Sequence, residues 1–276
     1  MSAIAAQQRR AHPPRPPRTV SSFLSPGTIG LLGGALAWEV VGQIANASFF
    51  PPLSAVVTRL VELTMDGQIA GNLASSLVNL AIGFAISLIF GIGIGMAMGA
   101  YRKVEMALDF YVFALLTAPT LVLAPVFFSI FGSSNPRPTI IGVIILYTIF
   151  IVIVNTTAAI RNVPAPLIEM GRSYCANERQ LFTRIILPAA TPLIMAGVRL
   201  GMGRAVKGMI NGEMFIAIVG LGAVVKKAGI RFDSEGVLAI LILIVIVAMI
   251  LTRIVQFVDH RLTGWLPSNA RQRKRA

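Results

Sequence analysis

The side chains best placed to do chemistry are charged residues that interrupt long apolar stretches. Arg204 and Lys207 lie three positions apart in the stretch that begins near Thr191, so on a helix they share one face. If that stretch crosses a bilayer, each charge costs roughly 2.5–3.5 kcal/mol and should face water, an acid or a second chain. One interpretation is that the pair lines a route for an anion. The alternative is that the pair lies at the membrane interface and extends toward water, or pairs with Glu213 or Glu39.

Two acids accompany these cations. Glu39 interrupts an apolar stretch near the N-terminus, where it has either a function, as intramembrane acids often do, or a purely structural role in the bundle interior. Glu213 follows Lys207 on the later stretch, and Arg199 precedes Arg204 by one to two turns. The excess of basic over acidic residues on this stretch favours a small anion as the molecule bound.

The residues do not support other kinds of site. Cys175 is the single cysteine, so it has no intramolecular disulfide partner, and His12 and His260 lie far from any ligand cluster. No Ser/His/Asp set or metal site can be assembled. Gly91-Ile-Gly-Ile-Gly95 lacks the third glycine of a dinucleotide-binding loop, and the chain contains no Gly-x-x-x-x-Gly-Lys-Ser/Thr phosphate loop. The residues therefore predict no catalytic centre, cofactor or metal in this chain.

The composition is that of a membrane protein. Of the 276 residues, 55% are hydrophobic and only 13% are charged, and the mean hydropathy is +0.78. A soluble domain is typically about 45–50% apolar and about 25% charged. The net charge of +13 would suggest nucleic acid in a soluble protein, but the basic residues lie mostly between and beyond the apolar stretches, where membrane topology explains them. We therefore expect an all-α polytopic membrane protein that contacts lipid and binds no nucleic acid.

Apolar stretches long enough to cross a bilayer predict about six transmembrane helices within a membrane domain of residues 25–265. Residues 53–66 fit an amphipathic helix at the outer surface, and residues 1–24 and 266–276 are predicted to be cytosolic tails, the first disordered and the second basic. Ala45-Asn46-Ala47 resembles a signal-peptidase site, so the first span is either a retained helix, which its length favours, or a cleaved signal. The predicted spans are 27–47, 71–99, 107–131, 139–160, a fifth from about Thr191, and 236–258.

Prolines and glycines predict where these spans bend and where they pack. Pro119 and Pro125 free backbone carbonyls in the third span, which should therefore kink or unwind. Gly91, Gly95 and Gly99 recur at four-residue spacing in the second span. We expect them to let a neighbouring helix approach closely.

Lysine and arginine predict the orientation. Most of the 24 basic residues fall in the two tails, in the short loop at 102–105 and in a polar segment at 161–191, whereas few fall in the segments on the other side. The positive-inside rule then places both termini and the 161–191 segment in the cytosol.

The 161–191 segment is too long and too regularly patterned to be only a turn. Pro164 and Pro166 suit the start of a first helix. Asn177 can cap a second helix, with Gln180 completing a capping box, and Pro188 is predicted to end that helix. Two amphipathic helices joined by a turn are expected to bind a partner. On the first helix, one side carries Leu167, Met170 and Tyr174 and the other carries Glu169, Arg172 and Ser173.

This segment resembles the cytosolic coupling loop of ABC importer permeases, in which Glu-Ala-Ala is followed by a glycine and, about a dozen residues later, by Ile-x-Leu-Pro. Glu169 matches the leading acid and Ile185-Ile-Leu-Pro188 the closing motif. Met170-Gly171 replaces the two alanines, and Cys175 stands at the glycine position. If that position has a positive φ, a Cβ there costs on the order of 1 kcal/mol.

The resemblance covers most of residues 30–265 and is to the nitrate, sulfonate and taurine importer permeases in particular. It implies a type I ABC importer fold and a permease subunit, not an enzyme, that passes a small anion such as a sulfonate, nitrate or an organic acid. Residues similar to those of the family occur at Phe50-Pro51, Pro119 through Pro125, Ala196-Gly-Val-Arg-Leu200, Arg204-Ala205, Gly212-Glu-Met214 and Gly220-Leu-Gly222.

The resemblance also implies partners and functional residues. A second permease copy would complete a homodimer, two copies of an ATP-binding subunit would hold ATP and Mg, and a periplasmic or lipid-anchored binding protein would deliver the solute at the bacterial inner membrane. The residues expected to contact the ATPase are Glu169, Met170, Gly171, Arg172, Ser173, Tyr174, Cys175 and Ala176; for Glu169, a local pairing with Arg172 or Ser173 is the structural alternative. The residues expected along the translocation pathway are Arg204, Lys207, Glu213, Met214 and Glu39, with Glu213 and Met214 near a gate.

Two other classes of protein remain as alternatives. A secondary transporter would work without an ATPase and would often have an internal repeat, and no repeat is visible across the two halves of this sequence. A polytopic membrane enzyme would need catalytic side chains that converge at one membrane face, and no such set stands out.

Overall fold

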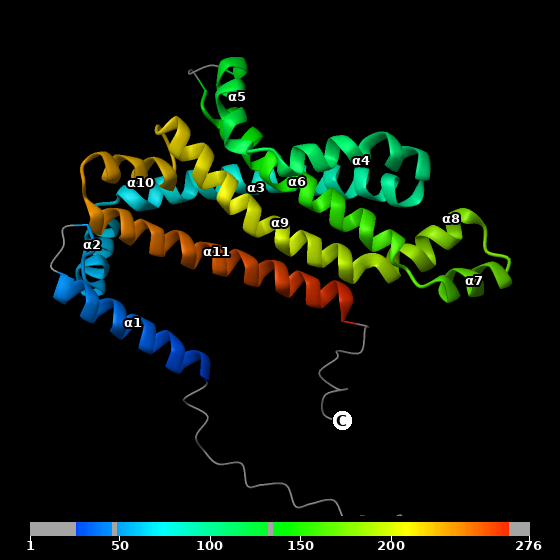
Figure 1. The fold of residues 1–276 in the computed structure, drawn as a ribbon, viewed down its shortest axis with the longest axis horizontal. Helices are drawn as coiled ribbons and strands as arrows, with labels where there is room; N and C mark the ends of the chain where they lie inside the picture. The colour runs from blue at the N-terminus through cyan, green and yellow to red at the C-terminus, as the bar shows by residue number, and fades with distance from the viewer. Residues whose placement is uncertain (1–25, 46–48, 132–134, 265–276) are drawn as a thin grey trace, which may run out of the picture.

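The computed structural model describes residues 26–45, 49–131 and 135–264, and within these ranges every regular element is a helix (Figure 1). Five helices are long and apolar enough to cross a membrane, and one bent pair, counted as a single span, makes six. The predicted fold class is therefore confirmed. The predicted tails and the signal-peptidase-like residues 46–47 lie outside the described residues. The elements are α1 (Pro26–Ala45), α2 (Leu53–Met65), α3 (Gln68–Ala100), α4 (Arg102–Thr117), η1 (Thr120–Leu123), α5 (Ala124–Phe131), α6 (Arg137–Arg161), α7 (Ala165–Ser173), α8 (Glu178–Leu181), η2 (Phe182–Ile186), α9 (Leu187–Ile216), α10 (Leu221–Ile230) and α11 (Ser234–Thr263).

Three long helices form the core, with α6 packed between α3 and α9 (Figure 1). Small residues allow this packing because a Cβ has no room at the contacts. An ideal Cβ on Gly95 of α3 would lie 2.6 Å from Cβ of Thr156 and 2.8 Å from the Ile153 carbonyl oxygen, and one on Gly99 would lie 2.6 Å from Cβ of Ile160. Gly91 likewise faces α6. The glycine-spaced stripe of the second predicted span thus lies against α6.

The third predicted span is broken. Helix α4 ends at Thr117, Pro119 follows, and the path of the chain turns by 96° into residues 120–131. Pro119 cannot donate a backbone hydrogen bond and restricts the residue before it to an extended conformation, which Ala118 adopts with ψ of 143°. Pro125 lies in the first turn of α5, where its missing N–H costs little.

Pro188 does not end a helix, so the sequence-based expectation was wrong. The chain is helical without interruption from Glu178 to Ile216. Residues Phe182–Ile186 form a π-helical turn, in which the Leu187 N–H donates to the Phe182 carbonyl five residues earlier. This wider turn accommodates the proline ring, which would otherwise clash with a carbonyl in the preceding turn. The fifth span therefore begins within the polar 161–191 segment and not near Thr191.

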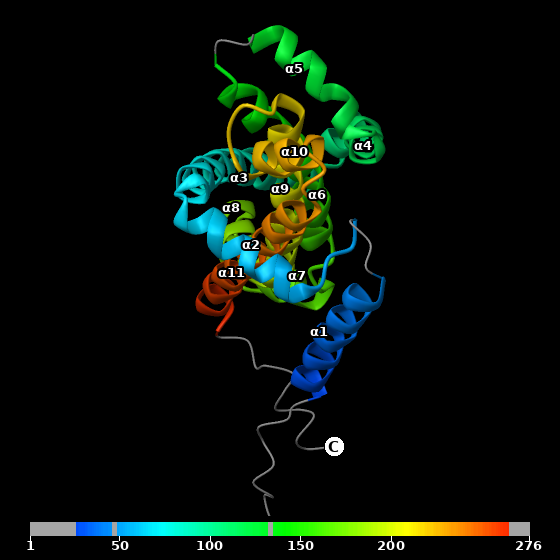
Figure 2. The ribbon, with the colours of Figure 1, turned by 90° about the vertical axis from the view of Figure 1, so that its left-hand side faces the viewer.

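Helix α1 stands apart from the bundle (Figure 2). Only 6% of its membrane-crossing window is buried, and it packs mainly against α2. The α1–α2 corner is nevertheless well defined, because the Trp38 indole donates to the Pro51 carbonyl at 3.2 Å and an ideal Cβ on Gly42 would lie 2.6 Å from Cα of Pro52.

Helix α11 packs against α9, α10 and α2, and an ion pair fixes its N-terminal end. The Asp233 carboxylate accepts hydrogen bonds from the Arg59 guanidinium of α2 at 2.8 Å and from the Gly236 N–H at 2.8 Å. Burial alone would raise the pKa of Asp233, but these hydrogen bonds outweigh it and hold the pKa below its ordinary value. The same contact raises the pKa of Arg59.

Candidate functional site

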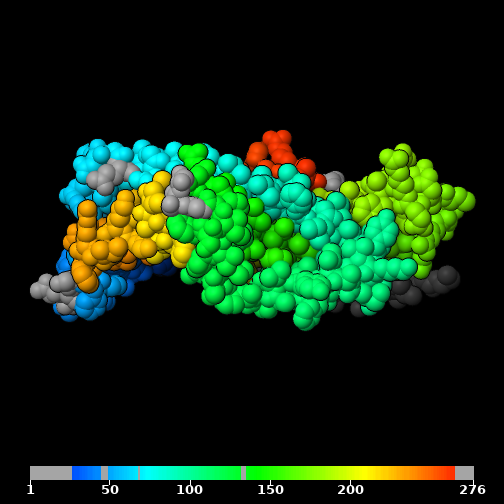
Figure 3. Space-filling view, turned by 90° about the horizontal axis from the view of Figure 1, so that it is seen from above, coloured from blue at the N-terminus to red at the C-terminus, as the bar shows by residue number. Residues whose placement is uncertain are grey.

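The segment at 165–181, which holds α7 and α8 and is called the α7–α8 segment below, projects as a lobe from one end of the molecule (Figure 3). Helix α7 ends in a Schellman motif: the Cys175 N–H donates to the Arg172 carbonyl at 2.9 Å, and the Ala176 N–H donates to the Gly171 carbonyl at 3.1 Å. Cys175 has a φ of 56°. The position where the family has glycine does require the left-handed conformation, and here cysteine adopts it.

The second half of the segment is held equally firmly. Asn177 and Gln180 form the predicted capping box, with reciprocal hydrogen bonds of 2.8 and 3.0 Å. Gly171 is buried against this helix, since a Cβ there would collide with the Ile185 side chain and lie 2.8 Å from Cδ1 of Leu181. Gly171, which departs from the family's alanine, therefore lets the two helices pack directly on one another.

The outer surface of α7 is apolar as well as charged. Met170 is 49% exposed and Tyr174 is 83% exposed, so the side that the sequence predicted to be apolar faces outward, while Gly171 faces inward and Ile168 is half-buried. Glu169 is exposed, and within the described chain its carboxylate forms none of the ion pairs.

The local pairing of Glu169 with Arg172, which was the structural alternative to an ATPase contact, is therefore not formed. Arg172 instead lies 3.8 Å from Glu178, and the Ser173 hydroxyl donates to the Glu169 backbone carbonyl at 3.0 Å. Of the remaining residues expected to contact an ATPase, Ser173 is exposed and Ala176 is half-buried.

A cleft of about 690 Å³ separates the α7–α8 segment from the ends of α3 and α6. Arg161, Arg172 and Arg179 line it together with Glu178. Arg161 is paired with Glu105 at the start of α4, so the charge of this arginine is already compensated.

The face of α9 with Arg204 and Lys207 is exposed, and Leu200 on the same helix is 56% exposed. Within the described part of the chain, neither Arg204 nor Lys207 is in an ion pair or hydrogen bond. The two acids that one alternative considered as their partners, Glu213 and Glu39, are both engaged elsewhere, so that pairing is not formed. Arg199 is paired, but with Asp259 near the end of α11.

Glu213 is fully buried and forms a structural contact. Its Oε2 accepts hydrogen bonds from the Ser76 hydroxyl at 2.9 Å and from the Gly222 N–H at 3.0 Å. Ser76 in turn accepts from the Leu221 N–H at 2.9 Å. Gly220 has a φ of 88°, and a Cβ there would collide with the Glu213 carboxylate. The motifs Gly212-Glu-Met214 and Gly220-Leu-Gly222 are therefore two sides of one hairpin, in which Met214 is half-buried.

Glu39 also has structural partners. Its carboxylate accepts hydrogen bonds from the Ser54 N–H at 2.9 Å and the Ser54 hydroxyl at 2.8 Å, in the first turn of α2, and from Gln43 at 2.7 Å. A carboxylate at a helix N-terminus meets unsatisfied N–H groups and the positive end of the helix dipole. Glu39 thus joins α1 to α2.

Several partners of these residues were not predicted from the sequence. Ser76 and Asn72 of α3 bind the hairpin, since the Gly220 N–H donates to the Asn72 side chain at 3.1 Å. Their only signal in the sequence is that they are polar residues in a long apolar helix, spaced by one helical turn. Asp259, the partner of Arg199, likewise stands out in the sequence only as a charged residue near the end of a long apolar helix. Among the described residues, no group of three or more histidines, cysteines and acids is placed to hold a metal ion.

Comparisons with known proteins agree with this architecture. The chain is 30% identical to a putative aliphatic sulfonates transport permease protein of Bacillus subtilis (strain 168), over 83% of each chain. It is 29% identical to the taurine transport system permease protein of Escherichia coli (strain K12), over 88% of this chain and 89% of the relative. The fold matches that of an inward-facing MetNI methionine ABC transporter structure with a TM-score of 0.57 and 18% identity, over 69% of this chain and 92% of the other.

Residues 89–264, which include the α7–α8 segment, the charged face of α9 and the Glu213 hairpin, match the family described as binding-protein-dependent transport system inner membrane components. The match extends over more than half of the chain. The chain therefore belongs to this family of ABC importer permeases.

Proposed function

We propose that this permease couples an ATP-binding subunit to the uptake of a small anion, as one half of a homodimer. The observation that carries the proposal is the exposed tip of α7, where Met170 and Tyr174 present apolar surface on a segment that projects from the bundle. Apolar side chains gathered on such a projection are typical of a protein–protein contact. Glu169 and Arg172 would supply the charged rim of that contact.

The link between the tip and the transport pathway would be mechanical. Since the chain is helical from Glu178 to Ile216, the α7–α8 segment continues directly into the helix that carries Arg204 and Lys207. The Schellman motif at Cys175 and the capping box at Asn177 hold the segment rigid. Movement of an ATPase bound at the tip would therefore be passed along one helix to the charged face.

ATP and its Mg ion would be bound by two copies of the ATPase subunit. The family membership supports this assignment, and the 276 residues contain no phosphate-binding loop. The basic character of the loops at 102–105 and 161–191 supports an arrangement in which the α7–α8 segment and both termini face the cytosol.

Two exposed features support a second copy of this chain as partner. Helix α1 is held apart from its own bundle by a well-defined corner and leaves most of a membrane-crossing helix without protein contacts. The exposed Arg204 and Lys207 would be unfavourable against lipid tails. A second copy would cover α1 and would enclose the two cations in a shared, hydrated pathway.

The solute would be a small anion. The relatives are named for aliphatic sulfonates and taurine, which carry a sulfonate group. Arg204 and Lys207 offer two positive charges that have no ion-pair partner in the described chain. Two such charges could bind a sulfonate group, nitrate or the carboxylate of an organic acid. A binding protein, periplasmic or lipid-anchored, would deliver the solute.

The first experiment tests the coupling. The permease is purified from its host in mild detergent, reconstituted with the ATPase that accompanies it, and assayed for ATP-dependent uptake. We expect Tyr174→Ala to reduce both co-purification and uptake by about tenfold, the effect of losing roughly 1.4 kcal/mol at an interface. Phe232→Ala is the matched control, because Phe232 is an equally exposed aromatic at a position far from α7. Uptake that needs neither ATP nor a partner would overturn the proposal in favour of a secondary transporter.

The second experiment tests the pathway. Lys207→Gln should lower the rate of sulfonate uptake and change the preference between sulfonates of different size, whereas Lys227→Gln, on an exposed lysine of α10, should not. If Lys207→Gln leaves both rate and preference unchanged in proteoliposomes, the anion route along α9 is wrong, although the coupling can still hold.

A further inference from the structure

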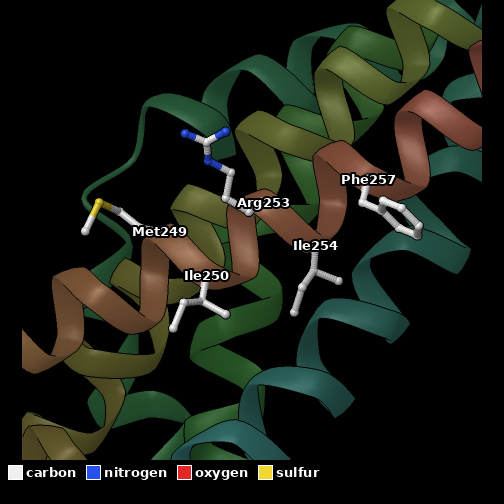
Figure 4. Close-up of a pocket in the computed structure, with 5 residues that line it drawn as sticks. All are labelled: Met249, Ile250, Arg253, Ile254 and Phe257. Carbon is white, nitrogen blue, oxygen red and sulfur yellow. The ribbon is translucent and has the colours of Figure 1, made fainter. Parts of the chain in front are cut away.

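Helix α11 carries a groove of about 390 Å³ on its outer side (Figure 4). Two rows of side chains at i, i+4 spacing flank the groove, one beginning at Met249 and the other at Ile250. Ile250 and Ile254 extend to one side of the helix in Figure 4, and the Arg253 side chain extends to the other. The lining residues are Met249, Ile250, Arg253, Ile254 and Phe257, so one cation lies in an otherwise apolar surface.

Arg253 is exposed, and within the described residues it is in none of the ion pairs or hydrogen bonds. The acid nearest to it in sequence on α11, Asp259, is already paired with Arg199 of α9. Arg261, two turns further along, lies over the ring of Phe257 at 5.2 Å, which brings a second positive charge to the same end of the helix. This end of α11 therefore presents positive charge that no carboxylate of the described chain neutralises.

The charge pattern of α11 places Arg253 at the level of lipid headgroups. Residues 236–252 carry no charge and are bounded by Glu235 and Arg253. At 1.5 Å per residue they span roughly 26 Å, close to the hydrocarbon thickness of a bilayer, about 30 Å. Met249 and Ile250 then lie at the depth of acyl chains, one turn inside Arg253.

We propose that this groove binds an anionic phospholipid, with its phosphate on Arg253 and an acyl chain along Met249 and Ile250. The charge of the site matches the lipid headgroup, and the apolar lining matches its tail. A soluble phosphate would not need an apolar groove beside the cation. A second permease copy fits this face less well than it fits α9, because the exposed surface of α11 around Arg253 is otherwise apolar, whereas α9 exposes two cations that require a hydrated or protein environment.

The test measures which lipids contact the groove. The full-length protein is reconstituted in phosphatidylcholine bilayers with Met249→Trp as a fluorescent probe, in a background where Trp38 and Trp265 are replaced by phenylalanine. Quenching by brominated phosphatidylglycerol is compared with quenching by brominated phosphatidylcholine. Leu241→Trp is the matched control: Leu241 is exposed on the same helix, two turns from Met249 and three turns from Arg253. Folding of each variant is checked by its elution as a single species.

We expect phosphatidylglycerol to be favoured about fivefold at Met249→Trp, as a single basic residue near an anionic surface predicts, and not at Leu241→Trp. Arg253→Gln should abolish the preference, Arg253→Lys should retain most of it, and excess inorganic phosphate should leave it unchanged. Equal quenching by both lipids with Arg253 present would overturn the proposal. So would the absence of quenching by either lipid at Met249→Trp alone, because the groove would then be covered by protein, for instance a second copy of the chain.

Discussion

The Glu213 carboxylate on α9 accepts a 2.9 Å hydrogen bond from the Ser76 hydroxyl on α3, and both side chains are fully buried. The same oxygen accepts the Gly222 N–H, so one acid joins α3, α9 and the start of α10. This contact explains why a charged side chain is present in an apolar span without being exposed. It also separates Glu213 from Arg204 and Lys207, which lie one to three turns earlier on α9 but on an exposed face.

Glu213→Ala should destabilise the protein by on the order of 1–3 kcal/mol. The substitution leaves the buried Gly222 N–H without an acceptor and the Ser76 hydroxyl without its partner, which is the costly way to lose a hydrogen bond. Glu213→Gln keeps one acceptor oxygen and should cost less. Thermal unfolding in detergent measures both. Lys207→Gln provides the control, since Lys207 is exposed; a similar loss of stability in that variant would argue against the hairpin as the cause.

Gly95→Ala and Gly93→Ala should have opposite effects on stability. A Cβ on Gly95 would lie 2.6 Å from Cβ of Thr156, so alanine there should force α3 and α6 apart at a cost of about 1–3 kcal/mol. Gly93 is on the same helix, and a Cβ added to it would have nothing within 4 Å, so alanine there should stabilise the helix by about 0.5–1 kcal/mol. Thermal unfolding of the two variants, measured side by side, distinguishes the effect of helix packing from that of helix propensity. Equal changes in stability in the two variants would contradict the close α3–α6 contact.

Cys175→Gly should stabilise the α7–α8 segment by roughly 1 kcal/mol, because glycine adopts a positive φ without the steric cost that a Cβ brings. Cys175→Ala keeps the Cβ and should be close to neutral. Hydrogen exchange of the backbone amides at 170–180 reports the local effect. Slower exchange in both variants would instead implicate the thiol, which is exposed.

The Arg59–Asp233 contact should make the end of α11 sensitive to acid. Since the pKa of Asp233 is lower in the folded protein than its ordinary value of 3.8, its contribution to stability is present above that pH and is lost as the pH falls through the folded-state pKa. The melting temperature of the parent should therefore fall more between pH 6 and pH 3 than that of Asp233→Asn, which has already lost the charge. Glu235→Gln, an exposed acid two residues away, should behave like the parent.

The features of the fold that depend on short stretches of sequence could be predicted from the sequence. The apolar stretches, the break at Pro119, the capping box at Asn177 and the small residues of α3 all depend on side chains a few positions apart or on a single residue type. The two short helices of the α7–α8 segment were predictable for the same reason. The path of the chain after them was not predictable, because whether Pro188 stops a helix depends on a π-helical turn that a linear pattern does not reveal.

The tertiary structure alone decided the partners of the buried and half-buried charges. Glu39, Arg199 and Glu213 looked alike in the sequence as ionisable residues in apolar spans, yet each has a different role: a helix cap at Ser54, an ion pair with Asp259 and a hairpin contact with Ser76. Each of these contacts joins residues that are 15 to 137 positions apart, and a hydrogen bond forms only where atoms meet within about 3 Å. The sequence by itself determined that the chain crosses a membrane and carries a polar helical segment at 161–191 between its apolar spans, because hydrophobicity and local patterning are sums over neighbouring residues. Only the tertiary packing, which brings α1 to α2, α11 to α9 and α3 to α9, determined which charges are satisfied within the chain and which, as at Arg204 and Lys207, remain on its surface.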